Sequence, residues 1–283
     1  MSSLEFIKRN SVLTYFSIVF IISWGLIIIL AGPGNLPIDA EQSKKLLPLL
    51  YILMLVGPSL AGVLLIGFIN GKAGFIKLKA RLLNWREGIR WYLVALLTAP
   101  ILASVILLLF SYLSPEFNYS IFSFQEKAPF LLSGIVIGLI VGLFEEIGWS
   151  GFVVPKLRQR YNIFMTGLIV GILWGAWHFI LFWESDSFSE TLPLLILLGR
   201  LFAWLPPFRV FMVWLLDRTE SLLIVILTHA SLVFTTTVLV PMTLTGKNLL
   251  TWLILWGAAL WVIVFVIALF QGGIFYQKQS EKK

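Results

Sequence analysis

Charged residues and cysteine are what this sequence has least of. Of its 283 residues, 12% are charged and 59% are hydrophobic, whereas a soluble domain carries about a quarter charged residues. This mixture cannot provide a water-exposed surface, so most of the chain must lie in lipid. The absence of cysteine excludes disulfides, thiolate metal ligands and a cysteine nucleophile.

Long apolar segments account for most of the chain. A helix needs about 20 apolar residues to cross a bilayer, and eight segments reach that scale: 12–32, 46–69, 91–113, 129–152, 165–183, 192–216, 221–242 and 249–270. Helices are expected because lipid offers no partner for backbone polar groups. The first segment is longer than the core of a cleaved signal peptide. The predicted fold is an all-α polytopic membrane bundle of about eight transmembrane helices, forming a single domain over residues 1–283.

Basic residues are distributed unevenly between the connections. Sixteen of the 21 fall on the side that holds both termini and the connections 70–90 and 153–161, with Arg209 and Arg218 counted on that side. The positive-inside rule therefore predicts a multi-pass protein of the cell membrane with both termini cytoplasmic. The net charge of +7 follows from this topology. Membrane lipid is the expected partner, and no nucleic-acid partner is expected.

Four ionisable residues interrupt the apolar segments. Glu145 and Glu146 lie in the fourth, and the only two histidines, His178 and His229, lie in the fifth and seventh. Such residues cost at least about 2.5 kcal/mol within a membrane, so they usually face a polar cavity and serve a function. Each of them alone could be structural, but together they predict a reaction centre.

The fourth and fifth segments are predicted to form an antiparallel helical hairpin. Glu145 lies sixteen residues before Tyr161, and His178 lies sixteen after Asn162. At 1.5 Å per residue, both would lie about 24 Å from the turn. Glycines that recur every fourth residue would let helices approach closely, so we expect the carboxylate and the imidazole to meet across this pair. These glycines are Gly134, Gly138, Gly142, Gly167, Gly171 and Gly175.

Arg200 lies inside the sixth segment, which also contains Pro206 and Pro207 and is expected to be broken or kinked. An arginine within a membrane needs a partner. Glu146 is one candidate. The alternative is that Arg200 reaches the outer face, towards Glu190. The tryptophans near the four site residues, including Trp149 and Trp174, are expected to be packing or interfacial residues.

Three stretches resemble the motifs of a known family. The run EEIGWSGF at 145–152, followed by PKL at 155–157, resembles a motif that reads Glu-Glu-x-x-x-Arg, then Gly-Phe and Pro-x-Leu. Trp174 stands four residues before His178, and His229 begins a His-Ala-Ser run. These features resemble the CPBP family, which comprises type II CAAX prenyl endopeptidases and bacteriocin-processing or immunity (Abi) proteins. The resemblance implies an eight-span intramembrane protease fold with its core at about 129–242.

Two positions depart from the family pattern. Ser150 stands where the first motif has arginine, and Val233 stands where the third usually has asparagine. The resemblance implies that the arginine orients the second glutamate and that the asparagine assists oxyanion binding. Another cation or donor is therefore expected at Glu146, or else a protonated, hydrogen-bonded carboxyl.

The chemistry that suits these residues is hydrolysis of a peptide bond in a membrane-embedded or membrane-associated substrate. Glu145 would act as general base on water, assisted by neutral His178. His229 would donate to the oxyanion, and Glu146 would hold the geometry. Alternatively, Glu145, His178 and His229 would bind Zn²⁺ that activates the water. The sequence leaves the choice open.

Two other classes compete with an intramembrane protease. Ser150 and Val233 favour a non-catalytic immunity or scaffold protein of the same fold. A proton-coupled transporter would also use buried Glu and His. Against a transporter, the sequence has neither an inverted repeat nor a pair of matched broken helices.

Overall fold

The computed structural model describes residues 3–32, 34–38, 40–271 and 274–275, and throughout these residues the regular structure is helical. Eight helical stretches within them are long and apolar enough to cross a membrane: Ser11–Ala31, Pro48–Leu82, Ile89–Ser111, Lys127–Leu157, Ile163–Phe182, Thr191–Thr219, Leu222–Leu239 and Gly246–Phe270. The predicted all-α bundle of about eight membrane helices is confirmed.

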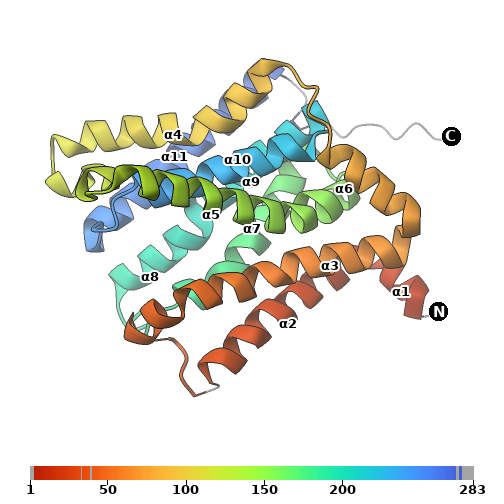
Figure 1. Cartoon of the computed structure of the whole chain (residues 1–283), viewed down its shortest axis with the longest axis horizontal. Coiled ribbons are helices and arrows are strands. Elements are labelled where there is room, and N and C mark those ends of the chain that lie inside the picture. The colour runs from red at the N-terminus through yellow and green to blue at the C-terminus, as the bar shows by residue number, and fades with distance from the viewer. Residues whose placement is uncertain (1–2, 33, 39, 272–273, 276–283) are drawn as a thin grey trace.

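Figure 1 shows the helices in chain order, with a longer connection between α4 and α5. They are α1 (Ser3–Arg9), α2 (Ser11–Ala31), α3 (Ala40–Leu82), α4 (Ile89–Ser111), α5 (Lys127–Gly148), α6 (Val154–Leu157), α7 (Ile163–Phe182), α8 (Thr191–Leu198), α9 (Leu205–Thr219), α10 (Leu222–Phe234) and α11 (Gly246–Gln271). Two 3-10 turns, Pro115–Phe117 and Ser120–Ser123, lie between α4 and α5.

Three of the spans contain a π-helical turn. Trp149–Val153 joins α5 to α6, Gly199–Ala203 lies between α8 and α9, and Thr235–Leu239 extends α10. The expected break in the sixth span is therefore a π turn, with Pro206 and Pro207 in the first turn of α9, where proline has no N–H to lose from the helix. π turns are rare in proteins, and those that occur are often found at functional sites.

The basic stretch 70–90, expected to be a connection, is mostly helical. α3 continues to Leu82 beyond a kink at Gly71, whose φ of 56° lies in the left-handed region. Glycine adopts this conformation without a steric penalty. The expected turn between the fourth and fifth spans ends at Asn162, which caps α7 by accepting a hydrogen bond from the backbone N–H of Met165 at 2.8 Å. The two spans do not pack as the expected hairpin, because α5 packs mainly against α10 and α3, and α7 against α9.

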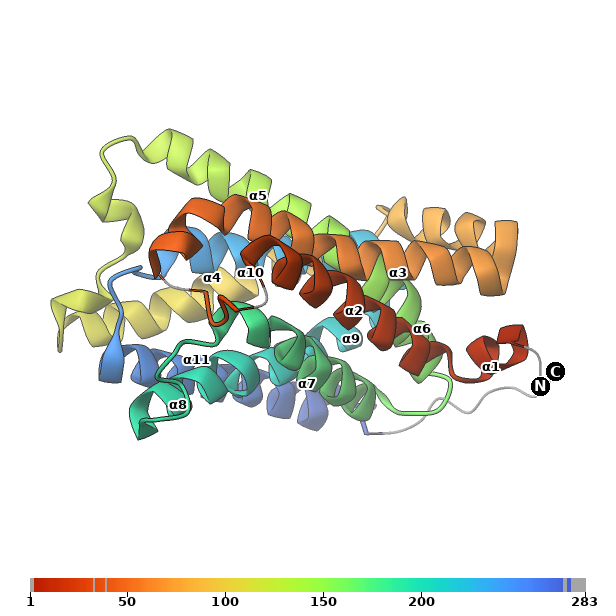
Figure 2. The same ribbon diagram turned by 90° about the horizontal axis from the view of Figure 1, so that it is seen from below.

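The helices pack in a layered bundle around α5, α7, α9 and α10. α5 packs against α10 and α3, α7 packs against α9, and α10 also contacts α4. α1 and α6 lie at one end, and the connections before α5 and α8 lie at the opposite end (Figures 1 and 2). Lys278, Lys282 and Lys283 lie outside the described residues, so the side of the C-terminus stays a prediction.

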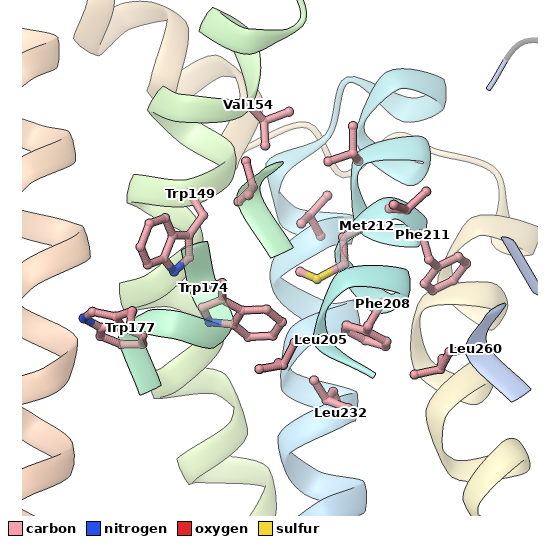
Figure 3. Packing of buried hydrophobic residues seen from close by; sticks show 14 of the residues in the cluster. Trp149, Val154, Trp174, Trp177, Leu205, Phe208, Phe211, Met212, Leu232 and Leu260 are labelled. Carbon is pink, nitrogen blue, oxygen red and sulfur yellow. The ribbon is translucent and has the colours of Figure 1, made fainter. Parts of the chain in front are cut away.

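Aromatic residues fill the centre of the bundle (Figure 3). Trp149, Trp174 and Trp177 are among the largest side chains that are fully buried. The rings of Trp149 and Trp177 meet edge to face at 5.7 Å, a favourable geometry for aromatic pairs. Phe208 and Met212 of α9 continue this core.

Candidate active site

The two glutamates lie in the last turn of α5, just before the π turn. Glu145 is 3% exposed and Glu146 is fully buried. Gly148 lets this turn approach α3, because a Cβ there would overlap the carbonyl of Pro58 and the hydroxyl of Tyr15. Because both carboxylates are buried, each of them needs partners within the protein.

Glu145 is held by two indole groups. Trp174 donates its Nε1–H to Glu145 Oε2 at 2.7 Å, and Trp149 donates to the same oxygen at 3.1 Å. Trp149 lies one helical turn beyond Glu145, and Trp174 reaches it from α7. Hydrogen bonds to a charged acceptor are stronger than those between neutral groups, so these two indoles fix the orientation of the carboxylate.

Glu146 is the centre of an ion-pair network. Arg209 Nη1 of α9 lies 2.9 Å from Oε1 and 2.8 Å from Oε2. His229 Nδ1 of α10 lies 2.8 Å from Oε1, and the Ser150 hydroxyl donates to Oε2. The side chains of Glu146 and Arg209 are both fully buried, so the carboxylate joins α5, α9 and α10 at one point.

The two histidines flank Trp174. His178 Nδ1 lies 2.8 Å from the carbonyl oxygen of Trp174. Because a carbonyl only accepts, this nitrogen carries the hydrogen, and Nε2 of the neutral ring is then an acceptor. The indole of Trp174 meets the rings of His178 and His229 edge to face, at 5.6 and 5.3 Å between centroids. His229 is 2% exposed, whereas His178 is half-buried.

Arg200 does not pair with Glu146. Its Nη1 lies 2.7 Å from Glu184 Oε1, and both side chains are partly exposed. The predicted pairing with Glu146 is therefore wrong, and in the alternative the partner is Glu184 and not Glu190. Whether this end of the helix faces the outer side of the membrane stays a prediction. The partner of Glu146 is Arg209, which the sequence analysis assigned to the basic side of the membrane and which lies instead in the core of α9.

The glycine stripes pack different helix pairs from the one expected. A Cβ at Gly138 or Gly142 would lie 2.5 Å from the carbonyl oxygen of Ala230 or 2.7 Å from that of Ile226, both in α10. A Cβ at Gly171 would meet Pro206 of α9. The stripes therefore join α5 to α10 and α7 to α9. Across α5 and α7, it is Trp174, one turn before His178, that bonds to Glu145.

The expected zinc ligands do not form a ready-made metal site. Nowhere in the described residues do three or more His, Asp or Glu side chains gather closely enough to hold a metal ion. Glu145 Oε2 and the Nδ1 atoms of both histidines bond to protein groups, so Glu145 Oε1 and the two Nε2 atoms are the ones that remain for a ligand. At the other departure from the family pattern, Val233 offers no polar group near His229.

Three residues of this cluster were not among the predicted site residues: Arg209, Trp149 and Trp174. Trp149 follows Glu145 by four residues, a spacing that puts both on one helix face, so its contact could have been inferred. Arg209 stands three residues after Pro206 and before an apolar run, a signal that it lies inside the helix.

Comparisons with known proteins agree with the motifs. Residues 127–235 match the family model described as type II CAAX prenyl endopeptidase Rce1-like. That range contains the whole Glu, His, Trp and Arg cluster. A "CAAX prenyl protease 2" from Methanococcus maripaludis is 27% identical over 191 residues, which cover 64% of this chain and 70% of that protein. These matches confirm the resemblance of the chain to the CPBP family of type II CAAX prenyl endopeptidases.

Proposed function

We propose that the chain is an intramembrane endopeptidase that hydrolyses a peptide bond with water activated by Glu145 and His178. The substrate is a membrane-embedded or membrane-associated peptide. The observation that carries the proposal is the buried cluster in which indole, imidazole and guanidinium groups orient two adjacent carboxylates. It lies within the region that matches an endopeptidase family.

Glu145 is the general base. Its Oε2 accepts both indole bonds, so Oε1 is the oxygen that takes the proton from water. The water oxygen then attacks the carbonyl carbon of the scissile bond. When the C–N bond breaks, the protonated Glu145 gives this proton to the leaving nitrogen, and the products are a carboxylate and an amine. Proton transfer by a positioned group contributes about 10²–10⁴-fold in rate.

His178 orients the water. Its Nδ1–H is engaged by the Trp174 carbonyl, so Nε2 has a free lone pair that can accept the second hydrogen of the water. This is the neutral form that the mechanism requires. Two acceptors, one from α5 and one from α7, then fix the direction in which the oxygen lone pair points.

His229 stabilises the oxyanion. Glu146 accepts from its Nδ1, so Nε2 donates to the tetrahedral intermediate when the ring carries both hydrogens. Glu146 offsets the charge of that ring. Arg209 and Ser150 hold Glu146, so the second glutamate acts through His229 and does not touch the substrate.

The proposed reaction is metal-free, because Glu145, His178 and His229 are not gathered closely enough in the described part of the chain to share one ion. We expect a chelator such as phenanthroline to leave the cleavage rate unchanged, and metal analysis of the purified protein to find no stoichiometric zinc. Loss of cleavage on chelation, restored by Zn²⁺, would support the zinc alternative, in which Glu145, His178 and His229 rearrange around the ion.

A second candidate is a non-catalytic immunity or scaffold protein with the same fold, and Val233 favours it. The resemblance implies an oxyanion-assisting asparagine at this position, and valine cannot donate a hydrogen bond. Under this alternative, the cluster around Glu146 would serve only to join α5, α9 and α10.

A peptide cleavage assay separates the two candidates. The chain would be purified in detergent and incubated with membrane-anchored peptides, including one sequence in prenylated and unmodified forms because of the printed name of the archaeal relative. The proposal expects cleavage by the wild type and cleavage slower by about 10²-fold or more by Glu145→Gln, with products identified by mass. Equal cleavage by both would refute the mechanism, and a folded wild type that cuts no peptide would favour the scaffold.

A further inference from the structure

Arg209 is a charged residue with an unusual position. It is fully buried in α9, with Val210, Phe211 and Met212 following it in the core. Burying an ion pair costs more in desolvation than the attraction usually returns, so a buried pair is weak evidence for stability alone. The buried pair of Arg209 and Glu146 therefore needs an explanation other than stability.

The local structure fixes where this guanidinium lies. Arg209 follows the two prolines in the first turn of α9. Gly171 of α7 admits α9 closely, since a Cβ there would lie 3.2 Å from Arg209 Cβ. The guanidinium then lies over the ring of Trp174, with Cζ 4.2 Å from its centroid. This distance is well within the range of cation–π attraction, so the tryptophan that holds Glu145 also supports Arg209.

Position 150 and position 209 serve the same carboxylate. The Ser150 hydroxyl and Arg209 Nη1 both donate to Glu146 Oε2, the first from the π turn after α5 and the second from α9. A serine at position 150 leaves Glu146 without a cation from its own helix. The cation arrives from α9.

We infer that Arg209 is a positioning residue for catalysis, and that it supplies from α9 the charge that position 150 would otherwise supply. This inference rests on the proposed endopeptidase function. Arg209 fixes both oxygens of Glu146, Glu146 Oε1 in turn accepts from His229 Nδ1, and the ring therefore turns its Nε2 towards the reacting carbonyl. Arg209 acts through these two groups and does not contact the substrate.

Only one nitrogen of Arg209 makes these bonds. Nη1 approaches both carboxylate oxygens, while Nε and Nη2 have no hydrogen-bond partner in the part of the chain that the structure describes. A single donor nitrogen can be imitated in part by the lysine ammonium, whereas the stacking on Trp174 cannot. The Arg209→Lys variant should therefore retain part of the cleavage activity.

The test is to move the arginine from one position to the other. Four variants are compared with the wild type for peptide cleavage: Arg209→Ser, Arg209→Lys, Ser150→Arg, and the exchange that combines Arg209→Ser with Ser150→Arg. Arg200→Met is the matched control, because it removes an arginine from a partly exposed ion pair with Glu184, outside the cluster around Glu146. Thermal melting in detergent reports whether each variant is folded.

A misplaced oxyanion donor should lower kcat and leave substrate binding nearly unchanged. We expect Arg209→Ser to lower kcat about 100-fold with KM within about threefold of the wild type. The kcat of Arg209→Lys should lie between those of the wild type and Arg209→Ser. The kcat of the exchange variant should exceed that of Arg209→Ser by about tenfold or more. Such non-additive effects of the two substitutions indicate that positions 150 and 209 share a role. Arg200→Met should match the wild type.

Imidazole spectra give a readout independent of turnover. The chain has two histidines, so ¹⁵N-histidine labelling yields two imidazoles, and the His178→Asn variant assigns the other. We expect His229 to show a hydrogen-bonded Nδ1–H in the wild type, to lose that signature in Arg209→Ser and to regain it in the exchange. Arg200→Met should leave it unchanged.

The outcomes are distinguishable. A folded Arg209→Ser variant with wild-type kcat and an unchanged His229 spectrum would overturn the inference. An exchange no better than Arg209→Ser, with both of them folded, would overturn the shared role of positions 150 and 209. If the exchange fails to fold, Arg209→Lys and Arg209→Ser still decide the positioning role. A wild type without cleavage would defeat the proposed function, and the spectra would still test the contact.

Discussion

Trp174 contacts more of the reaction centre than any charged residue does. It donates to Glu145, lies beneath Arg209 and touches both histidine rings at their edges. From the sequence, this residue was expected to be a packing or interfacial side chain. An indole can fill both roles, because it combines a large apolar surface with one N–H donor.

The donor role of Trp174 can be separated from its packing role. Trp174→Phe keeps a ring against Arg209 and removes the hydrogen bond to Glu145. Losing a bond to a charged group costs about 1.5–3 kcal/mol, which corresponds to a cleavage rate lower by about 10- to 150-fold. Steady-state kinetics on the folded variant would measure this effect.

Trp177→Phe is the matched control for that change. Trp177 is equally buried, and its Nε1 has no hydrogen-bond partner in the described chain, so the substitution removes a similar volume and no bond. We expect Trp177→Phe to cleave at close to the wild-type rate. Equal losses in both variants would mean that the hydrogen bond to Glu145 has no role of its own.

The identity of the partner of Glu146 could not be derived from the sequence. Arg200 and Arg209 both lie in the sixth apolar segment, nine residues apart. Which of them faces the carboxylate depends on the π turn between α8 and α9 and on the depth of each helix, and hydropathy specifies neither. That the four ionisable residues matter could be predicted from composition, because such residues are rare in an apolar chain, and their role in catalysis stays a prediction.

At the scale of helices, the eight spans were predictable because a long apolar run in lipid forms a helix, which satisfies its own backbone polar groups. Their ends were less predictable. The second and fourth spans continue as helix to Leu82 and Leu157, beyond the apolar residues. Neighbour relations were also not determined by the spacing. The glycine stripes indicated close contacts correctly but did not identify the helices on the other side.

The stripe on α5 gives a stability prediction. Gly138→Ala would place a methyl group 2.5 Å from the backbone oxygen of Ala230, and backbone cannot rotate away from it. Overpacking of this kind costs about 1–3 kcal/mol. We expect a lower melting temperature in detergent together with slower cleavage, because α10 carries His229.

Gly25→Ala serves as the comparison for that variant. No heavy atom lies within 4 Å of the Cβ it would add, and alanine favours a helix more than glycine does. Its melting temperature should therefore equal or exceed that of the wild type. A Gly138→Ala variant that melts like Gly25→Ala would contradict the tight contact between α5 and α10.

For the whole molecule, the orientation in the membrane is the main prediction still to be tested. The absence of cysteine makes single-cysteine labelling unambiguous. Lys79→Cys on α3 and Ser189→Cys before α8 are exposed positions. A membrane-impermeant thiol reagent added to intact cells should label Ser189→Cys and should label Lys79→Cys only after lysis. Labelling of Lys79→Cys in intact cells would reverse the proposed topology.

The rate of peptide hydrolysis by Glu145→Gln tests the central claim most directly. Glutamine keeps the shape of the side chain and an acceptor for the two indoles, but it cannot take a proton from water at neutral pH. With the melting temperature matched to the wild type, cleavage in H₂¹⁸O should place one ¹⁸O in the new carboxylate for the wild type. For Glu145→Gln, the rate of ¹⁸O incorporation should fall by about 10²-fold or more. Incorporation by the variant at the wild-type rate would contradict the account.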